Sequence, residues 1–192
     1  MDMTHYLVLL RGINVGGRNK VPMKELRSAL ESRGYRDVST YIASGNVLLA
    51  SADAPERIGP DIEAALVENF ALDDDLVRVL VLGRRELQQV IEHRPGAFGE
   101  HPDTYHSDAI FLIDVDVATA LEAFRPREGI DAVWPGDGVV YSQRLSAQLG
   151  KSRLSAIASS PLYKSMTIRS WRTTQKLWEL LQDRETAGRD PG

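Results

Sequence analysis

The sequence lacks cysteine entirely among its 192 residues. This absence excludes disulfides, zinc–thiolate sites, iron–sulfur clusters and thiol nucleophiles. Long apolar runs are also missing, because no stretch approaches the roughly 20 apolar residues that a membrane span needs. The apolar run 6–10 is too short for the core of a signal peptide, and no Lys or Arg precedes it. We therefore expect a cytoplasmic protein that does not bind a membrane.

A strong net charge is lacking too, since 23 Lys and Arg oppose 27 Asp and Glu. The charges are nevertheless distributed unevenly along the chain. Residues 1–37 carry a net charge of +3 and residues 144–184 carry +6, whereas residues 38–143 carry −12. If the two basic ends meet in the fold, they form a positive face on an acidic body. The alternative is that these charges lie on unrelated solvated helix faces.

The apolar periodicity predicts the same order of elements twice, strand–helix–strand–strand–helix–strand. In the first half, strands are expected at 6–10, 38–42, 47–50 and 76–82, with helices from Pro22 to Gly34 and over 55–70. In the second half, strands are expected at 109–115, 130–134, 139–142 and 166–169, with helices at 116–124 and 152–158. A helix over 84–93 links the halves, and a last helix opens at Trp171 or Arg172. Each half should form an antiparallel sheet covered by helices, so the fold class is α+β.

The expected domain boundaries follow from this order and from a loop rich in Pro, Gly, His and acidic residues. Residues 1–93 form the N-terminal half with its linking helix, and residues 94–107 form the linker. Residues 108–184 form the C-terminal half with the terminal helix. Residues 185–192 are expected to be a frayed tail.

The loop from Arg11 to Lys20 is the first candidate for chemistry, because it joins a strand to a helix and contains three glycines. Backbone N–H groups and a helix N-terminus at such a junction favour anions. The loop is neither a P-loop, since Arg18-Asn19 stands where Lys-Ser/Thr is required, nor a GxGxxG motif, since Asn14 replaces the second glycine. The alternative is a tight connection that needs positive φ angles.

Other polar clusters have simpler explanations. Ser44-Gly45-Asn46 is typical of a turn, with a hydrogen-bonding role for Ser44 or Asn46. The histidines and acids of loop 93–106 match no metal-ligand spacing, so we expect a polar linker and no metal. Asp73–Asp75 indicates a solvated turn, and Asp116 is expected to cap a helix. The basic residues around Trp171 could bind phosphates and stack bases, or could form the outer face of helices with an aromatic core.

Four segments together carry a family resemblance: 11–17, 19–23, 41–47 and 167–171. They resemble the bacterial domain-of-unknown-function family 1697, and the resemblance runs from about Tyr6 to Leu181. It implies an α+β fold with two ferredoxin-like halves, in agreement with the predicted element order. The activity of that family is not established, so the resemblance implies site positions and no reaction.

Carried over by position, the candidate ligand-binding residues are Arg11, Asn14, Asn19, Lys20, Ser44, Asn46, Arg169 and Trp171. The sequence departs from the family at two positions. Ser170 stands where the family usually has Asn, and Ala43 stands where it often has Gln. A hydroxyl at 170 has a shorter reach than an amide, so a contact there would differ in this protein.

These residues predict a basic polar cleft that binds a small anionic ligand, such as a nucleotide or a phosphorylated metabolite. We expect Arg11, Lys20 and Arg169 to converge there, because guanidinium groups suit planar anions. One alternative is an RNA-binding protein that uses the same face. Another is a non-catalytic scaffold whose motifs hold the two halves together. We expect no cofactor, while the sequence decides neither whether the protein is an enzyme nor its oligomeric state.

Overall fold

The structure is a computed structural model that describes residues 3–73 and 77–187. The chain forms two compact units, which we describe separately: Met1–Leu87 with Leu177–Gly192 (the first unit), and Gln88–Lys176 (the second unit). Helices α3 (Arg84–Glu92) and α5 (Trp171–Ala187) each have residues in both units. The predicted boundaries assigned the whole terminal helix to the C-terminal half, whereas the residues from Leu177 onward group with the first unit here.

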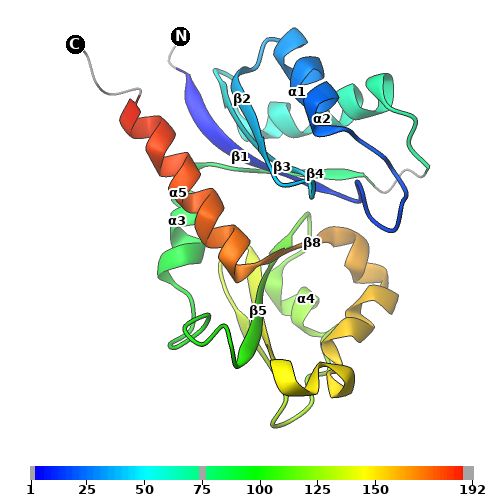
Figure 1. The fold of residues 1–192 in the computed structure, drawn as a ribbon, viewed down its shortest axis with the longest axis vertical. Coiled ribbons are helices and arrows are strands. Elements are labelled where there is room, and N and C mark those ends of the chain that lie inside the picture. Colours follow the sequence, from blue (N-terminus) through cyan, green and yellow to red (C-terminus); the bar gives the residue numbers. More distant parts are fainter. Residues whose placement is uncertain (1–2, 74–76, 188–192) are drawn as a thin grey trace. The chain divides into compact units, whose positions relative to one another are not determined.

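The first unit contains a four-stranded antiparallel sheet in the order β2-β3-β1-β4. Its elements are β1 (Thr4–Arg11), α1 (Met23–Ser32), β2 (Arg36–Tyr41), β3 (Asn46–Ser51), α2 (Pro55–Asn69) and β4 (Arg78–Leu82). Helices α1 and α2 lie on one face of this sheet (Figure 1). There Val8 packs in one core cluster with Leu26 of α1 and Ile62 of α2. Leu7 and Leu9 point to the opposite face and are also fully buried, which explains why β1 is a continuous apolar run.

The second unit repeats this topology in the order β6-β7-β5-β8, again antiparallel. Its elements are β5 (Tyr105–Leu112), α4 (Val117–Leu121), β6 (Asp131–Pro135), β7 (Val139–Leu145) and β8 (Met166–Ser170). Three 3₁₀ helices connect β7 to β8: Ser146–Lys151, Leu154–Ser159 and Pro161–Ser165. The predicted α+β class with two antiparallel, ferredoxin-like halves and a C-terminal helix is therefore confirmed.

Several details differ from the sequence expectations. The segment 152–158, expected as a helix, belongs to the 3₁₀ connection. Its buried residues Leu154 and Ile157 are three apart, a spacing that a 3₁₀ turn satisfies as well as an α-helix does. Pro22 is not the first helical residue but the N-cap of α1, with extended backbone at ψ 127°. Helix α5 opens at Trp171 as expected and runs to Ala187, and the rest of the expected tail lies outside the described residues. Within the described ranges, no helix has the length and apolar character needed to cross a membrane.

Candidate functional site

Two loops of the first unit meet at one end of its sheet, and we call them the loop pair: residues 12–21 and residues 42–45. The first follows β1 and the second joins β2 to β3. Their strands bring them together, because Leu9 of β1 pairs with Asn46 of β3. The backbone N–H of Leu10 then donates to the carbonyl of Gly45 at 2.8 Å. The loop pair therefore unites residues from three of the four segments that the sequence singled out.

The Asn14 side chain holds the loop pair together. Its Nδ2 donates to the carbonyl of Val21 at 2.9 Å and to the carbonyl of Ala43 in the other loop at 3.0 Å. Its Oδ1 accepts from the N–H of Val21 at 2.9 Å. The residue has a φ of 53°, in the left-handed region that Asn tolerates better than most residues. Asn14 thus bonds to backbone groups, which is a positioning role.

Asn19 plays a similar part and is nearly inaccessible, with 2% exposure. Its Nδ2 donates to the carbonyl of Gly12 at 2.8 Å. Asn19 and Asp73 also form a reciprocal pair, in which the backbone N–H of each donates to the side chain of the other at 2.6 Å. Asp73 was expected in a solvated turn, and it is exposed but bonds to this loop; Asp74 and Asp75 lie outside the described residues.

The second loop is held from within by Asn46, which is fully buried. Its Nδ2 donates to the carbonyl of Tyr41 at 3.0 Å and to Oγ of Ser44 at 2.9 Å. Ser44 itself is exposed. The turn predicted at Ser44-Gly45-Asn46 is present, and both predicted hydrogen-bonding residues take part in it.

Two cations of the loop pair, Arg18 and Lys20, are exposed, and Arg11, the last residue of β1, is partly exposed. No acidic residue occurs between Leu10 and Lys24 in the sequence, and the carboxylate of Asp73 reaches this loop through its bond to Asn19. Helix α1 begins directly after the loop, and its N-cap residue makes no side-chain capping bond. Helix N-termini and cations both favour negative charge.

The remaining two candidates, Arg169 and Trp171, belong to the second unit. Arg169 is 7% exposed and donates from Nη1 to Oγ1 of Thr167 at 3.0 Å and to the carbonyl of Ile168 at 2.8 Å. Removal from water lowers the pKa of its guanidinium to about 10, because burial disfavours the charged form. The predicted convergence of Arg169 with Arg11 and Lys20 stays a prediction.

Trp171 lies in an aromatic cluster and is 3% exposed. Its ring packs edge-on against Phe98, with centroids 5.1 Å apart, and 6.2 Å from Tyr141. Gly99 lies so close that a Cβ there would be 2.1 Å from the indole. Of the two readings that the sequence left open around Trp171, this burial favours the aromatic core, since a stacking platform must be accessible to a base.

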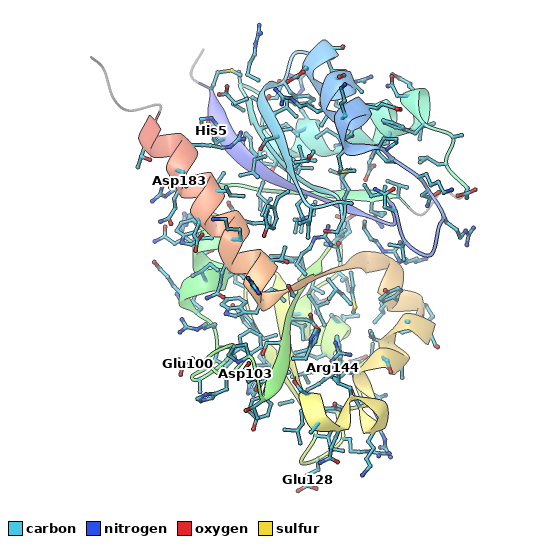
Figure 2. The ribbon with its side chains drawn as sticks, viewed as in Figure 1. His5, Glu100, Asp103, Glu128, Arg144 and Asp183 are labelled. Atoms are coloured by element: carbon cyan, nitrogen blue, oxygen red, sulfur yellow. The ribbon has the colours of Figure 1, made fainter. Side chains whose placement is uncertain are left out.

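Sequence reasoning missed a polar network on β5 and β7 of the second unit. Asp108, with a side chain 8% exposed, accepts from Nη2 of Arg144 at 2.8 Å and lies 3.2 Å from Nε2 of His106. Arg144 is labelled in Figure 2. His106 was expected in the linker loop, but β5 already begins at Tyr105. The signal in the sequence that could have indicated this network is the strand alternation along 105–112, which puts the polar residues 106 and 108 on one face of the strand. Within residues 3–73 and 77–187, no group of three potential metal ligands occurs.

Comparison with known proteins places the sequence beside proteins without a described activity. A family model described as a protein of unknown function (DUF1697) matches residues 3–141. A solved structure of a conserved bacterial protein from Streptococcus pneumoniae is similar, with a TM-score of 0.79 and 27% sequence identity, covering 94% of this chain and 99% of that chain. A search of curated proteins finds no match.

Proposed function

The chain belongs to the DUF1697 family, and we propose that it is a binding protein that takes a small anionic ligand, a nucleotide or a phosphorylated metabolite, on the loop pair of the first unit. The proposal rests on the first unit alone. The observation that carries it is that asparagine side chains fix the loop backbone, while the cations on it remain exposed.

A fixed loop favours binding because a ligand then does not have to order it. Each flexible side chain or loop that must be ordered on binding reduces the affinity, and preorganisation removes that cost. Asn14 and Asn19 bond to the backbone of residues 12, 21 and 43, as described above. These amides therefore position the loop and do not contact the ligand. In the first unit, the predicted ligand-binding residues are thereby narrowed to the cationic Arg11 and Lys20, and to Ser44.

Lys20 is the side chain to which we assign the main contact with the anion. It is exposed, and its two neighbours in the chain, Asn19 and Val21, are both bonded to Asn14, so its backbone is held from both sides. The N-terminus of α1 follows three residues later and adds a favourable dipole for negative charge. Arg18 and Arg11 are further cations of this region, and the carboxylate of Asp73, on Asn19, is a negative charge in it.

Titration with inorganic phosphate and ATP in a phosphate-free buffer tests the proposal. We expect saturable binding that Lys20→Ala weakens by about 10- to 100-fold, the effect of losing one hydrogen bond to a charged group. The matched control is Lys151→Ala, an exposed lysine of the second unit, which should leave binding unchanged. Neither change should lower the melting temperature by more than about 1 °C, since exposed lysines contribute little to stability.

Three outcomes would overturn the proposal. The first is no saturable binding of phosphate or ATP. The second is an equal effect of Lys20→Ala and Lys151→Ala, which would show nonspecific attraction. The third is binding of an RNA oligonucleotide with a steep salt dependence and no binding of ATP, since counterion release from several phosphate contacts is the mark of a nucleic-acid interface.

A further inference from the structure

Two aliphatic side chains are exposed on the loop pair beside the cations. Val15 is 67% exposed and Ile42 is 53% exposed. Each belongs to a different loop, and each is the chain neighbour of a residue in the hydrogen bond between Asn14 and Ala43. That bond, 3.0 Å long, joins the two loops at positions adjacent in sequence to both exposed aliphatic residues.

The backbone of Ile42 has an unfavourable conformation. Its φ is 49°, in the left-handed region, where a β-branched residue is a genuine outlier. Glycine or asparagine would adopt this conformation more easily, and burial does not compensate, since half of the side chain is exposed. Strain of this kind is concentrated at binding sites, where the surrounding structure holds it. The exposed isoleucine therefore occupies a strained position at the surface of the loop pair.

The cation and the aliphatic pair are connected through Asn14. Lys20 lies between two residues that bond to Asn14. Val15 follows Asn14 directly in the chain, and the carbonyl of Ala43, the neighbour of Ile42, accepts a hydrogen bond from the Asn14 side chain. A ligand on Lys20 that extends across this Asn14 junction would meet aliphatic surface. Isoleucine and valine offer no aromatic face for a base to stack on, so the surface suits an aliphatic group.

We propose that the anion bound by the loop pair is amphiphilic: a monoester of phosphate with an aliphatic chain, whose phosphate contacts Lys20 and whose chain covers Val15 and Ile42. This inference rests on the proposed function and names the ligand class for the same site. The ligand is a free, water-soluble organic phosphate and not a lipid in a bilayer. Contact with apolar surface adds affinity in proportion to the area removed from water.

A chain-length series provides the test: inorganic, methyl, butyl and hexyl phosphate, titrated as monomers at constant ionic strength. A methylene that is half covered should raise the affinity about twofold, which gives about a 30-fold rise from methyl to hexyl phosphate. Val15→Asn and Ile42→Asn should each flatten this rise and leave the affinity for inorganic phosphate unchanged. Ile42→Asn should fold, because Asn tolerates the left-handed conformation.

The matched control is Val67→Asn, which removes a valine of α2 that is 72% exposed and lies outside the loop pair. This variant should keep the chain-length dependence. If the wild type binds inorganic and hexyl phosphate equally, this inference fails and the proposed function stands. If no member of the series binds, this inference fails, and the proposed function fails with it only if ATP does not bind either. Tight binding to vesicles that contain an anionic phospholipid, with a flat monomer series, would also overturn the inference.

Discussion

A methyl group added at Gly45 should destabilise the first unit far more than one added at Gly17. Both glycines belong to the loop pair, and both have positive φ angles, 78° and 80°. They differ in their surroundings. A Cβ at Gly45 would lie 2.9 Å from Cβ of Leu10 and 3.0 Å from both Cδ1 of Ile13 and the carbonyl oxygen of Leu10, whereas a Cβ at Gly17 would meet nothing within 4 Å. Comparing the two variants therefore separates steric contact from backbone strain.

The magnitudes follow from these two contributions. An alanine in the left-handed region costs about 1–2 kcal/mol. Replacing glycine also reduces the conformational freedom of the unfolded chain, which raises the free energy of unfolding by about 0.4–1 kcal/mol. Gly17→Ala should therefore destabilise by about 0–1.6 kcal/mol. Gly45→Ala adds the cost of overpacking against the buried Leu10 and Ile13, about 1–3 kcal/mol, for a total of about 1–4.6 kcal/mol.

Urea-induced unfolding measures the difference, with both variants compared at the wild-type m-value because both changes lie in the same unit. A second readout is the affinity for inorganic phosphate, which Gly45→Ala should lower and Gly17→Ala should lower less, since Gly45 accepts the hydrogen bond from Leu10 that joins the second loop to β1. If the two variants unfold within about 0.5 kcal/mol of each other, the argument from close packing at Gly45 is refuted.

Two further predictions concern the second unit. Tyr141→Phe should cost about 1–2 kcal/mol, because the buried hydroxyl donates to the carbonyl of Val90 at 2.7 Å. Burial also raises the pKa of Tyr141 to about 12, so the stability that it contributes is present below its unfolded pKa of about 10 and is lost as the pH rises towards 12. Urea midpoints across that range should fall less in Tyr141→Phe than in the wild type. Asp108→Ala should cost about 3–5 kcal/mol by leaving Arg144 partly buried without its carboxylate, whereas His106→Ala, at the exposed side of the network, should cost less than about 1 kcal/mol. Similar thermal shifts for these two variants would contradict the assignment of Asp108 as the central residue.

Much of the architecture could be predicted from the sequence because it depends on local spacing. Apolar residues at every position or every second position indicated the strands, and Leu26 and Leu30 indicated one face of α1. Asp116 was expected to cap α4, and its Oδ1 does accept from the N–H of Thr119 at 2.9 Å. The connection from β7 to β8 was less predictable, since buried residues three apart fit an α-helix and a 3₁₀ helix equally well.

The segments that form the loop pair could be singled out from the sequence, but the roles of their polar side chains could not. The loop around Asn14 was identified from its glycines and its place between a strand and a helix, and Asn46 from the turn at Ser44-Gly45-Asn46. The family resemblance then made both residues site candidates. An asparagine side chain can bond to a ligand or to the backbone with the same atoms, so residue type does not distinguish the two roles. The structure assigns both amides to backbone carbonyls. Trp171 was ambiguous for the same reason, because an aromatic ring suits a core and a binding surface alike.

The sequence by itself determined the properties that follow from neighbouring residues: two repeats of one element order, the turns at glycine, and a basic loop without acids. Only the tertiary structure decided which distant segments meet. The reciprocal bonds between Asn19 and Asp73 join residues 54 positions apart, and the bond from Asn14 to Ala43 spans 29. Such partners depend on how the strands are ordered in the sheet, and that order follows from packing both faces of β1 at once. Packing of this kind is a property of the whole chain, and no local pattern encodes it.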